Sequence, residues 1–230
     1  MAGTPGEPVS LKEKVVEKGA EMMQSLKPVK QFKQHACTFA IYSHDMHRQM
    51  ETHHFIHRLN QDFCQCAVYD SDDPSARLIG VEYIISQRLF DALPSDEKKL
   101  WHSHFYEIKS ALWVTPGVAE AVVKPELDNL AKTYGKFWCT WQVDRGDLLP
   151  VGEPALMMSP QKEPPGVVKP PLVYHRDQKY NISSEKLSDQ RAGITGPTTI
   201  DPNADYWKKH KKGFAVDIVT TEMKKIAPFP

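Results

Sequence analysis

Several short runs between residues 35 and 143 alternate apolar side chains with other side chains, the pattern of a β-strand with one buried face. The expected strands are residues 37–41, 64–69, 78–85, 106–114 and 137–143. A dense turn signal, Asp70-Ser71-Asp72-Asp73-Pro74, joins the second of these strands to the third. Parallel strands need a crossover of about a dozen residues or more, and several connections here are too short for one. The sequence therefore predicts an antiparallel or mixed β-sheet.

Helices are expected between these strands. One covers residues 88–101 with a break near Pro94, and another covers residues 118–134 with an interruption at Pro125. Gly135 is expected to end the second helix. The predicted fold class is α+β, with helices packed mainly on one side of the sheet, an N-terminal amphipathic helix and an extended C-terminal arm.

The 18 prolines among the 230 residues concentrate at the two ends of the chain. We therefore expect three parts: a leader and amphipathic helix at residues 1–28, an α+β core domain at residues 29–160, and a Pro/Lys-rich arm at residues 161–230. The arm shows little apolar periodicity, so it is expected to be extended or partly disordered. Hydrophobic residues make up 40% of the chain, which suffices for one core.

The N-terminal helix begins with Ser10-Leu11-Lys12-Glu13, which has the spacing of a capping box, and is expected to end at Pro28. Its apolar residues fall on one stripe at helical spacing: Leu11, Val15, Met22 and Leu26. Two interpretations remain open. The stripe packs on the core domain, or it lies on a lipid surface.

Charge and cysteine content narrow the class of protein. Lys+Arg and Asp+Glu both number 29, and this zero net charge argues against a nucleic-acid binder. All four cysteines fall in apolar, strand-like runs without a secretory signal before them, so reduced, buried thiols in the cytosol are expected; Cys64-Gln65-Cys66 is alternatively half of a soft-metal site. The sequence contains no apolar run of the ~20 residues that cross a bilayer, so no transmembrane segment is predicted.

Seven of the ten histidines lie in two short runs, SHDMHRQMETHHFIH at residues 43–57 and WHSHFYE at residues 101–107. If residues 44–63 were helical, one edge of the helix would carry His44, His47, Glu51 and His54 beside the core. His102 and His104 would point to the same face of a strand. Imidazoles and carboxylates that converge are the ligands of a divalent transition metal, with zinc the expected ion. The predicted ligand set is His47, Glu51, His54, His102, His104 and Glu107, with Glu82 as a further carboxylate candidate.

Other interpretations of the histidines stay open. His102 and His104 would diverge if the preceding helix continued through residue 104, so they form a site only if that helix has ended by Trp101. The spacing matches neither HExxH nor a zinc finger. A metal-free His/Glu network that orders the domain and a general acid–base pair are the alternatives, although the sequence identifies no nucleophile, phosphate loop or dinucleotide fingerprint.

Four longer runs are similar to the plant oil body-associated proteins: CTFAIYSHDMHRQMETHHFIHRLNQDF, QCAVYDSDDPSARLIGVEYIIS, LWHSHFYEIKSALWV and TYGKFWCTWQVDRGDLLP. The similarity spans residues 29–160, and these proteins form part of a broader domain family of unknown function with fungal and bacterial relatives. Positions typical of the family are matched here by Glu51, His54, His102, His104 and Glu107.

The resemblance implies association with the surface of seed lipid droplets, at their cytoplasmic face beside a cytosolic pool, and a part in keeping droplets small and stable. It implies no catalytic activity and no oleosin-type hydrophobic hairpin. Attachment would be peripheral, through the N-terminal stripe, through exposed aromatics such as Trp113 and Trp207, or through other droplet proteins. Two further hypotheses are a metal-dependent enzyme acting on a lipid or small molecule, and a cytosolic interaction module whose arm engages a partner.

Overall fold

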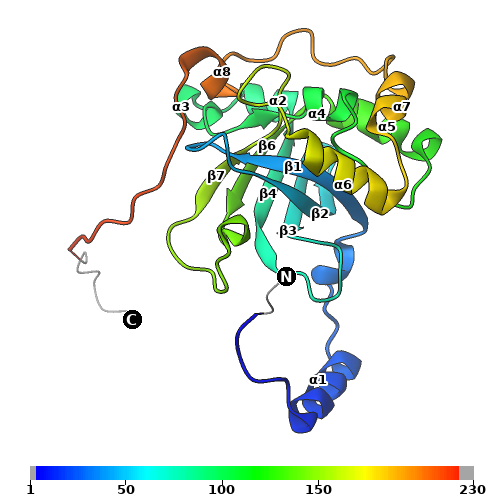
Figure 1. Ribbon diagram of the computed structural model, residues 1–230, viewed down its shortest axis with the longest axis vertical. Coiled ribbons are helices and arrows are strands. Elements are labelled where there is room, and N and C mark those ends of the chain that lie inside the picture. The colour runs from blue at the N-terminus through cyan, green and yellow to red at the C-terminus, as the bar shows by residue number, and fades with distance from the viewer. Residues whose placement is uncertain (1–3, 223–230) are drawn as a thin grey trace.

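The core of the protein is a β-sheet that closes on itself, as the computed structural model shows for the described residues 4–222 (Figure 1). Its strands are β1 Gln34–Tyr42, β2 Gln49–Asn60, β3 Phe63–Tyr69, β4 Leu78–Ser86, β5 His102–Ser103, β6 Thr133–Cys139 and β7 Ala155–Met158. They are ordered β4-β3-β2-β1-β7-β6-β5 with antiparallel pairing, and β4 also pairs with β6. Six strands therefore form a closed ring, and the short β5 lies beside β6.

The closed sheet is strongly staggered. Paired residues followed once around the ring from Gln34 lead through Glu82 and back to β1 at Tyr42, eight residues further along. Such a stagger tilts the strands and leaves an interior that side chains fill. The expected α+β class and antiparallel pairing are confirmed, but the closure was not predicted.

The expected strands at residues 37–41, 64–69 and 78–85 correspond to β1, β3 and β4, and the turn at residues 70–74 joins the antiparallel pair β3–β4. The helix expected at residues 44–63 is wrong, because β2 occupies most of that range. Its inward residues include Met50, Thr52 and His54, so polar side chains occupy both faces and hide the two-residue period.

Eight α-helices lie among the described residues: α1 Leu11–Met23, α2 Gln87–Asp91, α3 Ser95–Lys98, α4 Phe105–Lys109, α5 Glu120–Leu130, α6 Pro170–Tyr180, α7 Ser184–Gln190 and α8 Tyr206–His210. Two 3₁₀ turns, η1 Val29–Gln31 and η2 Val143–Arg145, complete them. The break expected near Pro94 separates α2 from α3. The strand expected at residues 106–114 is wrong, because α4 begins there, and Gly135 lies inside β6 rather than at the end of a helix.

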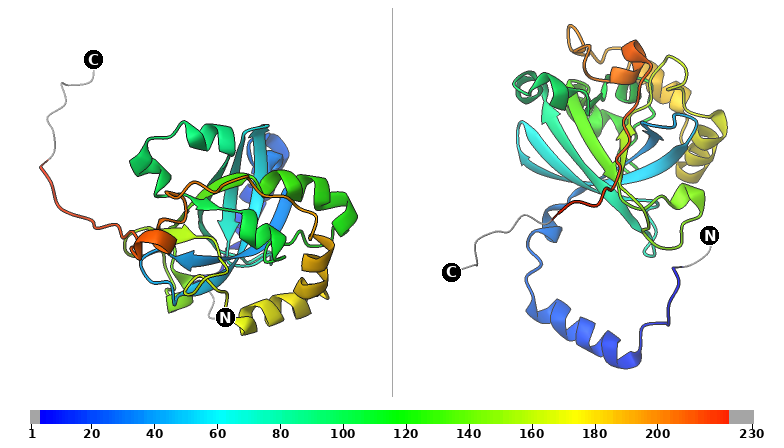
Figure 2. Two further views of the ribbon diagram at one scale, coloured as in Figure 1. Left: turned by 90° about the horizontal axis from the view of Figure 1, so that it is seen from above. Right: turned by 90° about the vertical axis from the view of Figure 1, so that its left-hand side faces the viewer.

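The expected extended arm differs from the structure over residues 170–210, where α6, α7 and α8 form. Figure 2 shows α6 and α7 along one side of the closed sheet. Arg176 and Arg191 are fully buried there and donate to backbone carbonyls of residues 108–113, so this part of the chain belongs to the folded body. Residues 223–230 of the arm lie outside the described residues.

Helix α1 stands apart from the folded body (Figures 1 and 2). The predicted capping box is confirmed, because the Ser10 hydroxyl accepts from the Glu13 amide and the Glu13 carboxylate accepts from the Ser10 amide. The helix ends at Met23, earlier than expected, so Leu26 lies beyond it with a positive φ of 45°. No residue of α1 is buried.

Candidate metal centre

Three histidine rings from distant parts of the chain converge on the carboxylate of Glu82 inside the closed sheet. His54 Nδ1 lies 2.8 Å from Glu82 Oε2, and His102 Nε2 lies 3.0 Å from Oε1. His104 Nε2 lies 3.5 Å from the same Oε1 and 3.8 Å from Glu107 Oε1. The five side chains are almost completely buried. Four of the six predicted ligands therefore meet at one place, together with Glu82.

Local structure explains how these rings meet. Helix α3 ends at Lys98, so His102 lies in β5, and His104 follows directly before α4. The preceding helix has therefore ended by Trp101, as a shared site of His102 and His104 requires. The centroids of these two rings lie 5.2 Å apart. His54 comes from β2 and Glu82 from β4, both from inward-facing positions.

The outer ring nitrogen of each histidine is held by a group that must accept a hydrogen. His102 Nδ1 lies 3.3 Å from the Met157 carbonyl oxygen, which only accepts. His104 Nδ1 lies 2.8 Å from Thr133 Oγ1, whose own hydrogen goes to the Leu130 carbonyl. His54 Nε2 lies 2.9 Å from Thr52 Oγ1, which likewise donates to the Thr38 carbonyl. All three outer nitrogens therefore carry the ring hydrogen.

The inner nitrogens of neutral rings must then present lone pairs toward the Glu82 carboxylate, which presents lone pairs in return. Such an arrangement needs positive charge between the groups, supplied either by ring protons or by a cation. The two buried carboxylates Glu82 and Glu107 would be balanced by one divalent ion, or equally by two protonated rings. Metal-bound histidines commonly have their other nitrogen fixed in this way.

Buried polar atoms that lack a hydrogen-bond partner lie at the same cluster. Among residues 4–222, five buried side-chain polar atoms have no hydrogen-bond partner, and three of them belong to His54, Glu82 and Ser159. These three residues line one cavity of about 10 Å³, which is about the room that a single bound water or ion needs. His54 Nδ1 and Glu82 Oε2 are close but lack hydrogen-bond geometry, so the donor set fits a metal ion better than a direct hydrogen bond.

Gly135 of β6 leaves room for this convergence. A Cβ atom there would overlap Glu82 Oε1 and lie 2.5 and 2.6 Å from the Nε2 atoms of His102 and His104. Three potential ligand atoms thus surround the space above one glycine.

Substitution of Gly135 by Ala should therefore push the ligand atoms apart. We expect metal content to fall well below one ion per chain and the free energy of unfolding to drop by roughly 1–3 kcal/mol, the usual cost of overpacking. Metal analysis and thermal unfolding would measure both. Gly193→Ala is the matched control, because a Cβ there meets nothing within 4 Å. Full metal occupancy in Gly135→Ala would contradict the assigned geometry.

Electrostatics around Glu82 favour a positive neighbour. Burial raises the pKa of Glu82, but the adjacent rings of His54, His102 and His104 outweigh burial and hold its pKa well below the ordinary value. Burial lowers the pKa of His102, yet the hydrogen bond and charge of Glu82 outweigh it, so the pKa is raised. Burial raises the pKa of Glu107. The polar groups of the cluster thus compensate one another only if positive charge lies beside Glu82.

Two predicted ligands do not join the cluster, and the reason is the strand that replaces the expected helix. His47 lies exposed in the turn before β2, where its carbonyl oxygen accepts from Lys169 Nζ. Glu51 points to the outer face of β2 and accepts from His53 Nε2 at 3.0 Å, while His53 Nδ1 lies 3.0 Å from His35 Nε2. Ligand atoms of His35, His53 and Asp72, and those of Cys37, Glu51 and His53, also lie within 4.8 Å of one another, but hydrogen bonds already join Glu51, His53 and His35.

Three further residues were not included in the predicted ligand set. Glu82 occupies the centre of the cluster, but its strand alone carries no signal that distinguishes it from another buried-strand carboxylate. Cys66 pairs with Glu82 in the sheet, and ligand atoms of His54, Cys66 and Glu82 lie within 4.8 Å of one another. Trp113, expected as an exposed aromatic, is instead buried between the rings of His54 and His104.

The chain matches known proteins over most of its length. Residues 26–195 match a family described as a protein of unknown function, DUF1264. Oil body-associated protein 2A of Zea mays is 60% identical over 227 residues, which cover 98% of this chain and 90% of that protein. The chain therefore belongs to the family of oil body-associated proteins.

The likeness within this family extends to other plants and other members. Oil body-associated protein 2A of Arabidopsis thaliana is 59% identical over 226 residues, covering 98% of this chain and 92% of the relative. Oil body-associated protein 1B of Arabidopsis thaliana is 42% identical over 193 residues, covering 84% of this chain and 79% of the relative. No solved structure gives a significant match. Of the helices between residues 4 and 222, none has both the length and the apolar character to cross a membrane.

Proposed function

We propose that this protein attaches peripherally to the surface of oil bodies, at their cytoplasmic face, and that its coat helps to keep the droplets small and stable. The names of its relatives support the location. The observation that carries the mode of attachment is the unpartnered apolar stripe of α1. A cytosolic pool would accompany such reversible binding.

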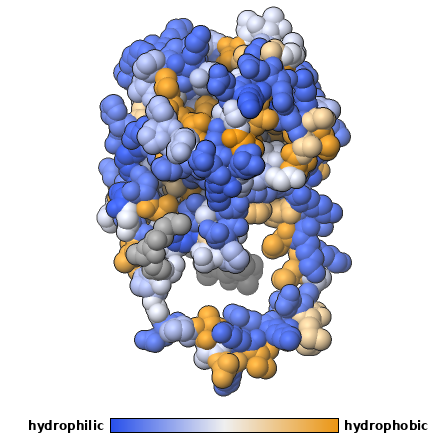
Figure 3. Space-filling model, turned by 45° about the vertical axis from the view of Figure 1, so that its right-hand side comes forward, coloured by the Kyte–Doolittle hydropathy of each residue, from blue (hydrophilic) through white to orange (hydrophobic). Residues whose placement is uncertain are grey.

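Helix α1 offers apolar side chains that no part of the folded body covers. Leu11, Val15 and Met22 are 82%, 73% and 81% exposed, and Leu26 beyond the helix is 43% exposed. Figure 3 shows apolar side chains on α1, set off from the rest of the molecule. Burial of each such side chain in lipid contributes roughly 1.5–3 kcal/mol, which suits reversible attachment. Trp207 does not serve this purpose, because it is buried.

A triple substitution tests this attachment. Leu11→Ser/Val15→Ser/Met22→Ser should lower binding to purified oil bodies at least tenfold and move a fluorescent fusion into the cytosol, because the apolar face is gone. Flotation of oil bodies with bound protein measures the first effect, and imaging measures the second. Thermal unfolding should not change, since no residue of α1 is buried.

The opposite face of α1 provides the control. Lys14→Ser/Glu17→Ser/Glu21→Ser changes the same number of residues of this helix, leaves the stripe and the capping box intact, and should bind like the wild type. Undiminished flotation of the stripe variant would refute α1 as the anchor. Counting and sizing droplets in seeds that lack the protein then tests the part of the proposal that concerns droplet size.

As a second function, we propose that the cluster around Glu82 binds one divalent transition metal ion, with zinc the expected ion. The ligands would be His54, Glu82, His102 and His104, with Glu107 and Cys66 beside them. Nitrogen and carboxylate oxygen ligands suit zinc. The three unsatisfied buried atoms at the cavity support an ion over a metal-free network.

The size of the cavity favours a structural role for the ion over a catalytic one. Space of about 10 Å³ admits a water molecule but no lipid or organic substrate. Structural zinc sites are closed and contribute directly to folding free energy. We therefore propose a stabilising role, in which the ion ties β2, β4 and the segment at residues 102–107 together. Metal-dependent catalysis on a lipid would need a larger opening than the described residues provide.

A further inference from the structure

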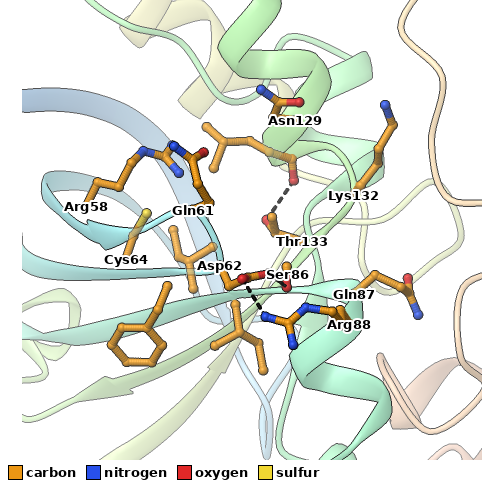
Figure 4. Close-up of a pocket in the computed structure, with 14 residues that line it drawn as sticks. Arg58, Gln61, Asp62, Cys64, Ser86, Gln87, Arg88, Asn129, Lys132 and Thr133 are labelled. Atoms are coloured by element: carbon orange, nitrogen blue, oxygen red, sulfur yellow. Dashed lines mark hydrogen bonds and ion pairs between the residues drawn. The ribbon is translucent and has the colours of Figure 1, made fainter.

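A sealed metal centre needs a route by which the ion arrives, and one end of the closed sheet offers it. Inward-facing residues at the ends of β2, β3, β4 and β6 line a pocket of about 350 Å³ that opens to solvent. Arg58, Cys64, Ser86 and Thr133 lie around it in Figure 4. We call this space the mouth pocket.

The mouth pocket lies one layer of side chains from the cluster. Thr133 belongs to both places, because it lines the pocket and its Oγ1 accepts from His104 Nδ1 at 2.8 Å. Cys64 pairs with Ile84, and two residues further along β3 Cys66 pairs with Glu82. Two residues of a strand span roughly 6.5–7 Å. The Cys64 and Ile84 side chains are thus the last layer above the ligands.

The charges at the mouth pocket do not oppose a cation. Arg88 pairs with Asp62 at 2.6 Å, Lys132 pairs with Asp128 at 2.9 Å, and Arg58 pairs with Glu126. Each basic side chain is therefore matched by a carboxylate, and the rim carries no excess positive charge.

Side chains block two other approaches to the cluster. A neighbouring pocket of about 300 Å³ beside α5 is separated from the cluster by Trp113. The centroid of the Trp113 ring lies 5.7 Å from that of His54 and 5.8 Å from that of His104. The far part of the interior holds packed core residues, including Tyr42, Met50 and Val68. The side chains of Cys64 and Thr133 are smaller than the Trp113 ring, so the approach from the mouth pocket is closed by smaller groups.

We propose that a divalent transition metal ion enters and leaves the cluster through the mouth pocket, past Cys64, an inference that rests on the proposed metal centre. The ion sheds its water along the polar rim and passes a thiol before it reaches Cys66 and Glu82. Cysteine binds such ions as the thiolate, so transient contact with Cys64 would release the proton of its thiol. Movement of the Cys64 and Ile84 side chains is then the step that limits exchange.

Plugging the mouth pocket should slow exchange without changing the final occupancy. Asn129→Trp at the exposed rim and Cys64→Phe at the floor should each slow zinc loading of the metal-free protein, and its removal by a chelator, at least tenfold. A zinc-sensitive dye in a stopped-flow instrument follows both rates. Occupancy at equilibrium should stay at one ion per chain, because no ligand has changed. Asn129→Trp keeps the test valid if Cys64→Phe folds poorly.

Val122→Trp is the matched control, since Val122 is an exposed residue of the same helix that lines the neighbouring pocket instead. It should exchange zinc at the wild-type rate. Wild-type rates in Asn129→Trp, or equal slowing in Val122→Trp, would overturn the route while leaving the metal centre intact. A wild-type protein that takes up no zinc at all would refute the metal centre itself.

Discussion

Replacing Glu82 by Gln should abolish stoichiometric metal binding and lower thermal stability more than any other single change in the cluster. Glu82 is the group on which His54, His102 and His104 all converge, so its loss removes the charge that the ion needs. An ion present at about a thousand times its Kd stabilises a fold by roughly 4 kcal/mol. For a chain of this size, that corresponds to a Tm lower by roughly 8–16 °C.

His53→Gln is the matched control for Glu82→Gln. His53 adjoins His54 in β2, and it is also buried, but it faces outward to Glu51 and His35. Its substitution should leave metal content unchanged, although some stability is lost. Chelation of the wild type should reproduce the Tm of Glu82→Gln. A metal-free His/Glu network would instead make the wild-type Tm indifferent to chelators.

Replacing Arg191 by Ala should destabilise the folded body by about 3–5 kcal/mol, the usual cost of breaking a buried ion pair. The guanidinium is fully buried, donates to the carbonyls of Ile108 and Trp113, and pairs with both oxygens of Glu120. Its removal takes the partner from the Trp113 carbonyl and from the Glu120 carboxylate, whereas the Ile108 carbonyl still accepts from the Ala111 amide. Thermal unfolding should show a Tm lower by roughly 6–20 °C.

An exposed ion pair provides the control for the stability effect of Arg191→Ala. Arg145 pairs with Asp147 in a turn, with 40% of its side chain exposed, and Arg145→Ala should cost no more than ~1 kcal/mol. Because Arg191 holds the loop that carries Trp113, its loss should also loosen the metal cluster and speed zinc release. Unchanged stability of Arg191→Ala would mean that α7 does not secure the domain.

The sequence predicted the parts of the fold that follow a simple period. β1, β3 and β4 alternate apolar and polar residues, and the capping box of α1 is a local motif. β2 could not be recognised, because it places Thr52 and His54 inside and Glu51 and His53 outside, so neither face is apolar. Closure of the sheet depends on the pairing of β4 with β6, a long-range contact that no local pattern encodes.

The candidate site was predicted where residue type and strand geometry sufficed. His102 in the short strand β5 and His104 directly after it both reach Glu82, and His54 joins them as expected. His47 and Glu51 were included because a helical period was assumed. Glu82 and Gly135 gain their importance only when β4 and β6 lie side by side, which the sequence does not reveal.

The helices α6–α8 were not expected, because prolines and lysines obscure any apolar period in residues 161–210. Buried arginines secure α6 and α7, and Leu172 and Val173 of α6 pack against the Phe39 cluster. Pro170 is compatible with the start of a helix, where a missing amide hydrogen costs nothing. Proline content alone therefore does not indicate disorder in this part of the chain.

Metal analysis of the purified wild-type protein by native mass spectrometry, together with Glu82→Gln and His53→Gln, tests the convergence on Glu82 most directly. We expect one zinc-sized divalent ion per chain in the wild type and in His53→Gln, and none in Glu82→Gln. Metal-free wild-type protein that does not take up zinc, cobalt or manganese, and whose Tm is unaffected by a chelator, would contradict a metal centre at this site.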